Sequence, residues 1–103
     1  MKHLFPIALV ALVSFAPAAA FAGPIENACN RSERPNANRQ LCRCIEAAAD
    51  RTLTRSEQRR AARFFSDPDE AQEVRMSTTD ADNEFWARYR AFGDLAEQMC
   101  GQG

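Results

Sequence analysis

Lysine and histidine are nearly absent from this chain, which has one of each, at Lys2 and His3. Every other basic residue is arginine. The rest of the chain therefore has no histidine, the side chain that most often serves as a general base and metal ligand near neutral pH. It also has no lysine, whose amine is needed for Schiff-base chemistry. We expect neither catalytic residues nor a cofactor, and predict that the protein is not an enzyme.

Long apolar runs are also absent, except for one at the N-terminus. After the basic Met1-Lys2-His3, residues 4–16 are almost continuously apolar, and Ala20-Phe21-Ala22 precedes Gly23. A run of about thirteen residues is too short to cross a bilayer as a helix, and this pattern is typical of a cleavable signal peptide. We predict a signal peptide over residues 1–22, cleaved after Ala22 on the general secretory route. The mature chain, residues 23–103, is expected to be periplasmic or secreted and not membrane-embedded.

All four cysteines, Cys29, Cys42, Cys44 and Cys100, follow the predicted cleavage site. An even number of cysteines in an exported chain predicts a disulfide framework. On a helix, Cys42 and Cys44 point about 160° apart, so each should bond to a different element. Which of them pairs with Cys29 is not decided by this geometry, although we favour Cys29–Cys44 with Cys42–Cys100. Cys42-Arg43-Cys44 could instead exchange disulfides or hold a metal, but structural bridging fits an exported chain better.

The mature chain is predicted to be all-α. Helices are expected over about residues 37–52, 55–65, 68–76 and 80–99, after a lead-in at 23–31 of one or two turns and a loop at 30–38. Helix starts are indicated by a capping box from Thr54 to Glu57, by Asp67 before Pro68, and by residues 77–80. The fold class is thus a single domain, residues 23–103, built as a small bundle of about four helices joined by two disulfides.

Apolar residues recur at helical spacing along these segments. In the last helix they form one continuous face, with Cys100 on an adjacent stripe directed toward the cysteine-bearing helix. In the helix over 55–65 we expect a second inner face. The residues assigned to these two faces are Phe85, Tyr89, Phe92, Ala96 and Met99, and Gln58, Ala61, Ala62 and Phe65.

Charge is distributed unevenly. Residues 23–66 contain nine arginines and five acidic residues, whereas residues 67–103 contain three arginines and nine acidic residues. Either the two halves pack together with complementary charges, or an arginine-rich face binds an acidic partner. The candidate partner-binding residues are Arg55, Arg59, Arg60 and Arg63, together with Trp86, Arg88 and Arg90. Nucleic acid is not expected as a ligand, because the mature chain is exported and carries net negative charge.

The cysteine spacing and an aromatic motif resemble a known family. Pro24-Ile25 before Cys29, Leu41-Cys42-Arg43-Cys44-Ile45, the run from Phe64 to Pro68, Phe85-Trp86 and the late Cys100 match small secreted four-cysteine helical proteins of Gram-negative bacteria. That family is uncharacterised and offers no catalytic residues, although its members are sometimes labelled arginine transporter. The resemblance implies a small exported helical protein.

Three functions follow as hypotheses. The first is a protein-binding or accessory module of the periplasm with an unidentified protein partner. The second, suggested by the family label, is an accessory or binding component of arginine transport, for which no small-molecule site is evident in the sequence. The third is a thiol-redox factor that uses Cys42 and Cys44.

Overall fold

The computed structural model describes residues 22–34 and 37–101, and these residues form five helices and no strand. The helices are α1 (Pro24–Arg31), α2 (Arg39–Thr52), α3 (Arg55–Ser66), α4 (Pro68–Arg75) and α5 (Asp80–Cys100). The all-α prediction is confirmed, and the lead-in is itself a helix. The predicted signal peptide lies outside the described residues except for Ala22. None of the described helices combines the length and apolar character needed to cross a membrane.

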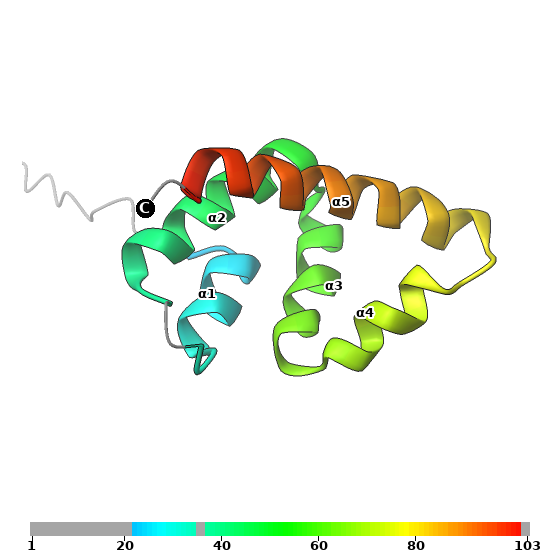
Figure 1. Ribbon diagram of the computed structural model, residues 1–103, viewed down its shortest axis with the longest axis horizontal. Coiled ribbons are helices and arrows are strands. Elements are labelled where there is room, and N and C mark those ends of the chain that lie inside the picture. Colours follow the sequence, from blue (N-terminus) through cyan, green and yellow to red (C-terminus); the bar gives the residue numbers. More distant parts are fainter. Residues whose placement is uncertain (1–21, 35–36, 102–103) are drawn as a thin grey trace, which may run out of the picture.

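The long helix α5 runs along one side of the molecule, with α2 beside it (Figure 1). Helix α1 packs against both α2 and α3, and α4 connects α3 back to the start of α5. In Figure 1, α1, α3 and α4 all lie on the same side of α5. This arrangement places α3 between α1 and the α4–α5 corner, so α3 contributes to two separate surfaces.

The core lies where these helices meet. Ile25 of α1 and Ala48 and Ala49 of α2 are fully buried. On α3 the expected inner residues Gln58 and Ala61 are buried, but Ala62 and Phe65 are only half-buried. Phe64, which was not assigned to the inner face, is buried against α5 instead. The expected face of α5 packs into the same core, with Phe85 and Phe92 buried and Tyr89, Ala96 and Met99 partly buried.

The helix starts predicted from the sequence are confirmed, with one difference. At the start of α3, the Glu57 amide donates to Thr54 Oγ1 (3.1 Å), and the Thr54 amide donates to Glu57 Oε1 (2.9 Å). Thr79 caps α5 by accepting from the Asp82 amide at 3.2 Å. Asp67 occupies the N-cap position of α4, but its side chain makes no capping hydrogen bond. Pro68 follows it in the first turn, where its missing amide proton removes one donor that would need a partner.

Both disulfides form, but the favoured pairing was wrong. Cys29 bonds to Cys42, and Cys44 bonds to Cys100. As expected, Cys42 and Cys44 reach different helices. The partners are exchanged because α1 packs on the flank of α2 that carries the fully buried Cys42, whereas α5 lies along the flank that carries Cys44.

Candidate partner-binding surface

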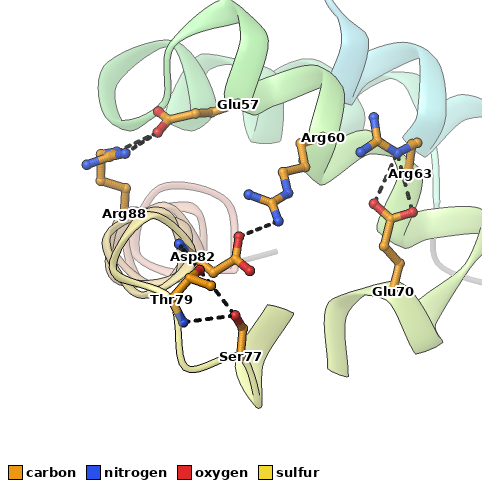
Figure 2. A network of polar contacts seen from close by, with 8 residues as sticks. All are labelled: Glu57, Arg60, Arg63, Glu70, Ser77, Thr79, Asp82 and Arg88. Carbon is orange, nitrogen blue, oxygen red and sulfur yellow. Dashed lines mark hydrogen bonds and ion pairs between the residues drawn. The ribbon is translucent and has the colours of Figure 1, made fainter. Parts of the chain in front are cut away.

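Three arginines of the predicted partner-binding set form ion pairs within the chain (Figure 2). Arg60 of α3 pairs with Asp82 of α5 at 2.7 Å, and Arg63 of α3 pairs with Glu70 of α4 at 3.0 Å. Arg88 of α5 pairs with Glu57 of α3. All three pairs link α3 to residues 67–103, and the first two join an arginine of the arginine-rich half to an acid of the acidic half.

The Arg60–Asp82 pair joins α3 to α5 within the fold. The Arg60 guanidinium also lies over the Phe85 ring, 4.6 Å from its centroid, which adds a cation–π contact. Hydrogen bonds from Ser77 and Arg60 and the charge of Arg60 lower the pKa of the Asp82 carboxyl. Figure 2 shows Asp82 beside the Ser77–Thr79 turn that begins α5. Arg60 therefore anchors the start of α5 against α3.

The Arg88–Glu57 pair is attached to the capping box of α3. Burial alone would raise the pKa of Glu57, but hydrogen bonds from Arg88 and from the Thr54 amide outweigh it, so this pKa is lowered. The same contact raises the pKa of Arg88. Glu57 thus closes the first turn of its own helix and attaches α5 to it.

A hollow on the described surface lies between α1 and α3 and has a volume of about 780 Å³. Ala28, Ala62 and Phe65 provide its apolar lining, and we call it the α1–α3 groove. The arginines that line it are Arg31, Arg59 and Arg63, and Glu33 is its one acidic lining residue. Arg34 extends the positive charge, because its guanidinium lies 5.7 Å from the centroid of the Phe65 ring. A lining of apolar and mainly basic side chains is suited to a partner segment that is acidic and partly apolar.

The arginines of α3 also border a second, smaller hollow. It has a volume of about 360 Å³, and its lining includes Arg59, Arg60, Arg63 and Arg88 with Phe85. Arg59 and Arg63 therefore line both hollows. Arg59 is exposed and makes no ion pair with any described residue, which leaves its guanidinium available to a ligand.

The remaining predicted residues are not part of the α1–α3 groove. Trp86 is half-buried, with its ring 5.1 Å from that of Tyr89. Arg90 and Arg55 are exposed and form no ion pair with the described residues. Of the predicted residues, only Arg59 and Arg63 thus line the α1–α3 groove.

Sequence reasoning did not include Arg31 among the partner-binding residues. Arg31 ends α1, a segment expected to be only a lead-in. Its position beside α3 follows from the packing of α1 on that helix, which the sequence pattern does not reveal. The amphipathic spacing of Ile25 and Cys29 was the available signal that this segment is a helix with an outer face.

The cysteines leave no thiol in the described chain for redox or metal chemistry. All four are in disulfides, and Cys29 and Cys42 are buried. A reactive cysteine must expose a thiolate. The disulfides of Cys42 and Cys44 instead join α1 and α5 to α2.

Comparison of the chain with protein-family models, curated proteins and solved structures finds no match.

Proposed function

We propose that the protein is exported, loses residues 1–22, and acts in the periplasm as a disulfide-bonded module that binds an acidic segment of a partner protein. Two disulfides suit an oxidising compartment. The absence of a membrane-crossing helix from the described residues is compatible with this location. The resemblance to small secreted four-cysteine helical proteins is part of the same proposal.

The α1–α3 groove is the observation that carries the proposal. Its rim brings Arg31 of α1 next to Arg59 and Arg63 of α3, over an apolar lining that includes Phe65. Guanidinium groups donate paired hydrogen bonds to carboxylates, and arginine and aromatic residues dominate binding hot spots. Arg63 already forms an ion pair with Glu70. Binding should therefore depend most on Arg31 and Arg59.

The other two hypotheses have less support. Free arginine would bring its own guanidinium into a groove that already contains three, and like charges repel. A thiol-redox factor would need a thiolate, and both cysteines of Cys42-Arg43-Cys44 are bonded to other helices. An accessory role in amino-acid uptake remains compatible with the groove if it binds a protein of the uptake system.

Charge reversal at matched positions tests the proposal. The mature protein is titrated with a fluorescent peptide that alternates glutamate with leucine, and with the same peptide carrying lysine in place of glutamate. We expect only the acidic peptide to bind, with an affinity that falls as salt rises. Arg59→Glu and Arg31→Glu should each weaken binding about tenfold or more, which corresponds to the loss of one charge-assisted contact.

Arg90→Glu is the matched control, because Arg90 is likewise exposed and without an ion pair among the described residues but lies on α5 outside the groove. It should retain the affinity of the wild type. Free arginine should neither bind detectably by calorimetry nor displace the peptide. Equal losses for Arg59→Glu and Arg90→Glu, or binding of the basic peptide, would exclude the groove as the site.

A further inference from the structure

Glu46 is a buried carboxylate that is only half satisfied. It lies on α2 with 6% of its surface exposed. Its Oε1 accepts a hydrogen bond of 2.8 Å from the Glu26 amide in the first turn of α1. Its Oε2 is also buried, yet no described residue donates to it. A buried ionised oxygen without a partner is strongly unfavourable, so this carboxyl must either be protonated or meet a positively charged donor.

Gly23, just before α1, lies close to the Glu46 carboxylate. Gly23 is buried, and a Cβ atom placed on it would lie 2.6 Å from Oε2 of Glu46 and still closer to Cδ and Oε1. Two substituents on one Cα lie about 2.5 Å apart, so the Gly23 nitrogen is within about 5 Å of both oxygens. The φ of Gly23 is −69°, so glycine is needed here for the close approach and not for backbone conformation.

The other charged groups near Glu46 do not neutralise it. Glu26, Arg43, Asp50 and Arg55 line the small hollow that also contains Gly23 and Glu46. Neither arginine forms an ion pair with Glu46. Burial, together with Asp50, raises the pKa of the Glu46 carboxyl despite the opposing effect of the Glu26 and Ile25 amides. While the Ala22–Gly23 peptide bond is intact, the Glu46 carboxylate thus has too few hydrogen-bond donors around it.

We propose that the α-ammonium group created at Gly23 by signal-peptide cleavage is the missing partner of Glu46. Hydrolysis of the Ala22–Gly23 bond consumes one water, releases the leader with a carboxylate on Ala22, and converts the neutral Gly23 amide into an ammonium. An amide has one proton and no charge, whereas the ammonium has three protons and a full positive charge. The ion pair that results joins the new N-terminus to α2.

This pairing couples processing to stability. A positive charge at the N-terminus of a helix is normally unfavourable, and Glu46 supplies the anion that compensates it at the start of α1. The leader-bearing chain lacks the ammonium and should be less stable than the mature form, which suits a polypeptide that must stay unfolded during export. The inference rests on the cleavage after Ala22 that the proposed function includes, but not on the partner.

A double-mutant cycle tests the inference. The mature chain that begins at Gly23 is compared with a chain that retains Ala22, each with Glu46 and with Glu46→Gln. The two lengths have the same net charge, and the longer one also keeps the hydrogen bond from Asn27 Nδ2 to the Ala22 carbonyl, 3.1 Å. We expect the Gly23 form to have a folding equilibrium constant about tenfold or more above that of the Ala22 form, and Glu46→Gln to remove this advantage.

A titration gives a second readout that does not require a variant. In the mature wild type, NMR of glycine-labelled protein should show the Gly23 ammonium with a pKa above the usual value of about 8. Equal stability of the two lengths with equal effects of Glu46→Gln, or an ordinary pKa for the ammonium, would refute the pairing. An N-terminus other than Gly23 on protein isolated from the periplasm would also refute it. None of these results depends on peptide binding, so the groove proposal is judged separately.

Discussion

Phe64 and Phe65 are adjacent in α3 but have different surroundings. Neighbouring positions on a helix point about 100° apart. The Phe64 ring meets those of Phe85 and Tyr89 in edge-on geometry, with centroid distances of 6.1 Å and 5.2 Å. The Phe65 ring is half-buried at the groove, with Arg34 over it. One aromatic residue therefore serves the core, and the other serves the surface proposed to bind a partner.

Alanine at each position should separate the two roles. Phe64→Ala removes a buried ring and should lower the free energy of unfolding by about 3–5 kcal/mol. Phe65→Ala should lower it by clearly less, because the side chain is half-exposed, but should weaken binding of the acidic peptide. Urea unfolding with intact disulfides measures the first effect. A larger loss of stability in Phe65→Ala than in Phe64→Ala would contradict the assignment.

The sequence predicted that Phe65 would be buried, whereas the structure buries Phe64, and this error shows a limit of helical periodicity at the residue scale. The helical period of Ala61, Ala62 and Phe65 predicts a single inner face for α3. That reasoning assumes one packing partner, whereas α3 packs against α1 on one side and meets α4 and side chains of α5 on the other. A helix with two partners buries a wider surface than one stripe, and the sequence pattern does not show which residue faces which partner.

At the scale of elements, helix starts and lengths were predicted well because their causes are local. The Thr54 and Thr79 caps depend on residues three positions away in the chain. Disulfide pairing could not be predicted in this way. It depends on whether α1 or α5 covers a given flank of α2, which is decided by tertiary packing and not by residues a few positions away. The groove has the same origin, because Arg31 and Arg59 meet only through the packing of α1 on α3.

The two disulfides should contribute unequally to stability. Cys29–Cys42 spans 13 positions in the chain and Cys44–Cys100 spans 56. Loop-closure entropy of the unfolded chain then gives about 3 kcal/mol for the first bond and about 4 kcal/mol for the second. We expect Cys44→Ala/Cys100→Ala to unfold at lower urea concentration than Cys29→Ala/Cys42→Ala. The reverse order would show that the burial of Cys29 and Cys42 outweighs loop length.

At the scale of the whole molecule, an arginine-rich half is packed against an acidic half. Two of the three ion pairs join an arginine of residues 23–66 to an acid of residues 67–103, and the third has the opposite polarity. The sequence left open whether this asymmetry is internal or faces a partner. In the structure Arg60, Arg63 and Arg88 form ion pairs within the fold, whereas Arg59 and Arg31 have no ion pair among the described residues.

This division predicts how stability depends on pH. The folded-state pKa values of Glu57 and Asp82 are lowered from 4.5 and 3.8. A carboxyl with a lowered pKa in the folded state stabilises the fold above its unfolded pKa, and this contribution is lost as pH falls through the folded value. Stability should therefore fall as the pH drops below about 4.5. Glu57→Gln and Asp82→Asn should be less stable than wild type at pH 7 and converge with it at low pH.

Asp94→Asn, also on α5 but exposed and without an ion pair among the described residues, is the control and should follow the wild-type curve.

Glu46 should act in the opposite direction where its pKa stays raised, because a protein whose carboxyl has a raised folded pKa gains stability as pH falls toward the unfolded pKa. That gain should be seen in the chain that retains Ala22 and be absent from the chain that begins at Gly23, where the ammonium keeps Glu46 ionised. Urea midpoints measured from pH 3 to pH 7 on both lengths would thus separate the interhelical pairs from the N-terminal pair. Parallel curves for the two lengths would mean that Glu46 does not respond to the new N-terminus.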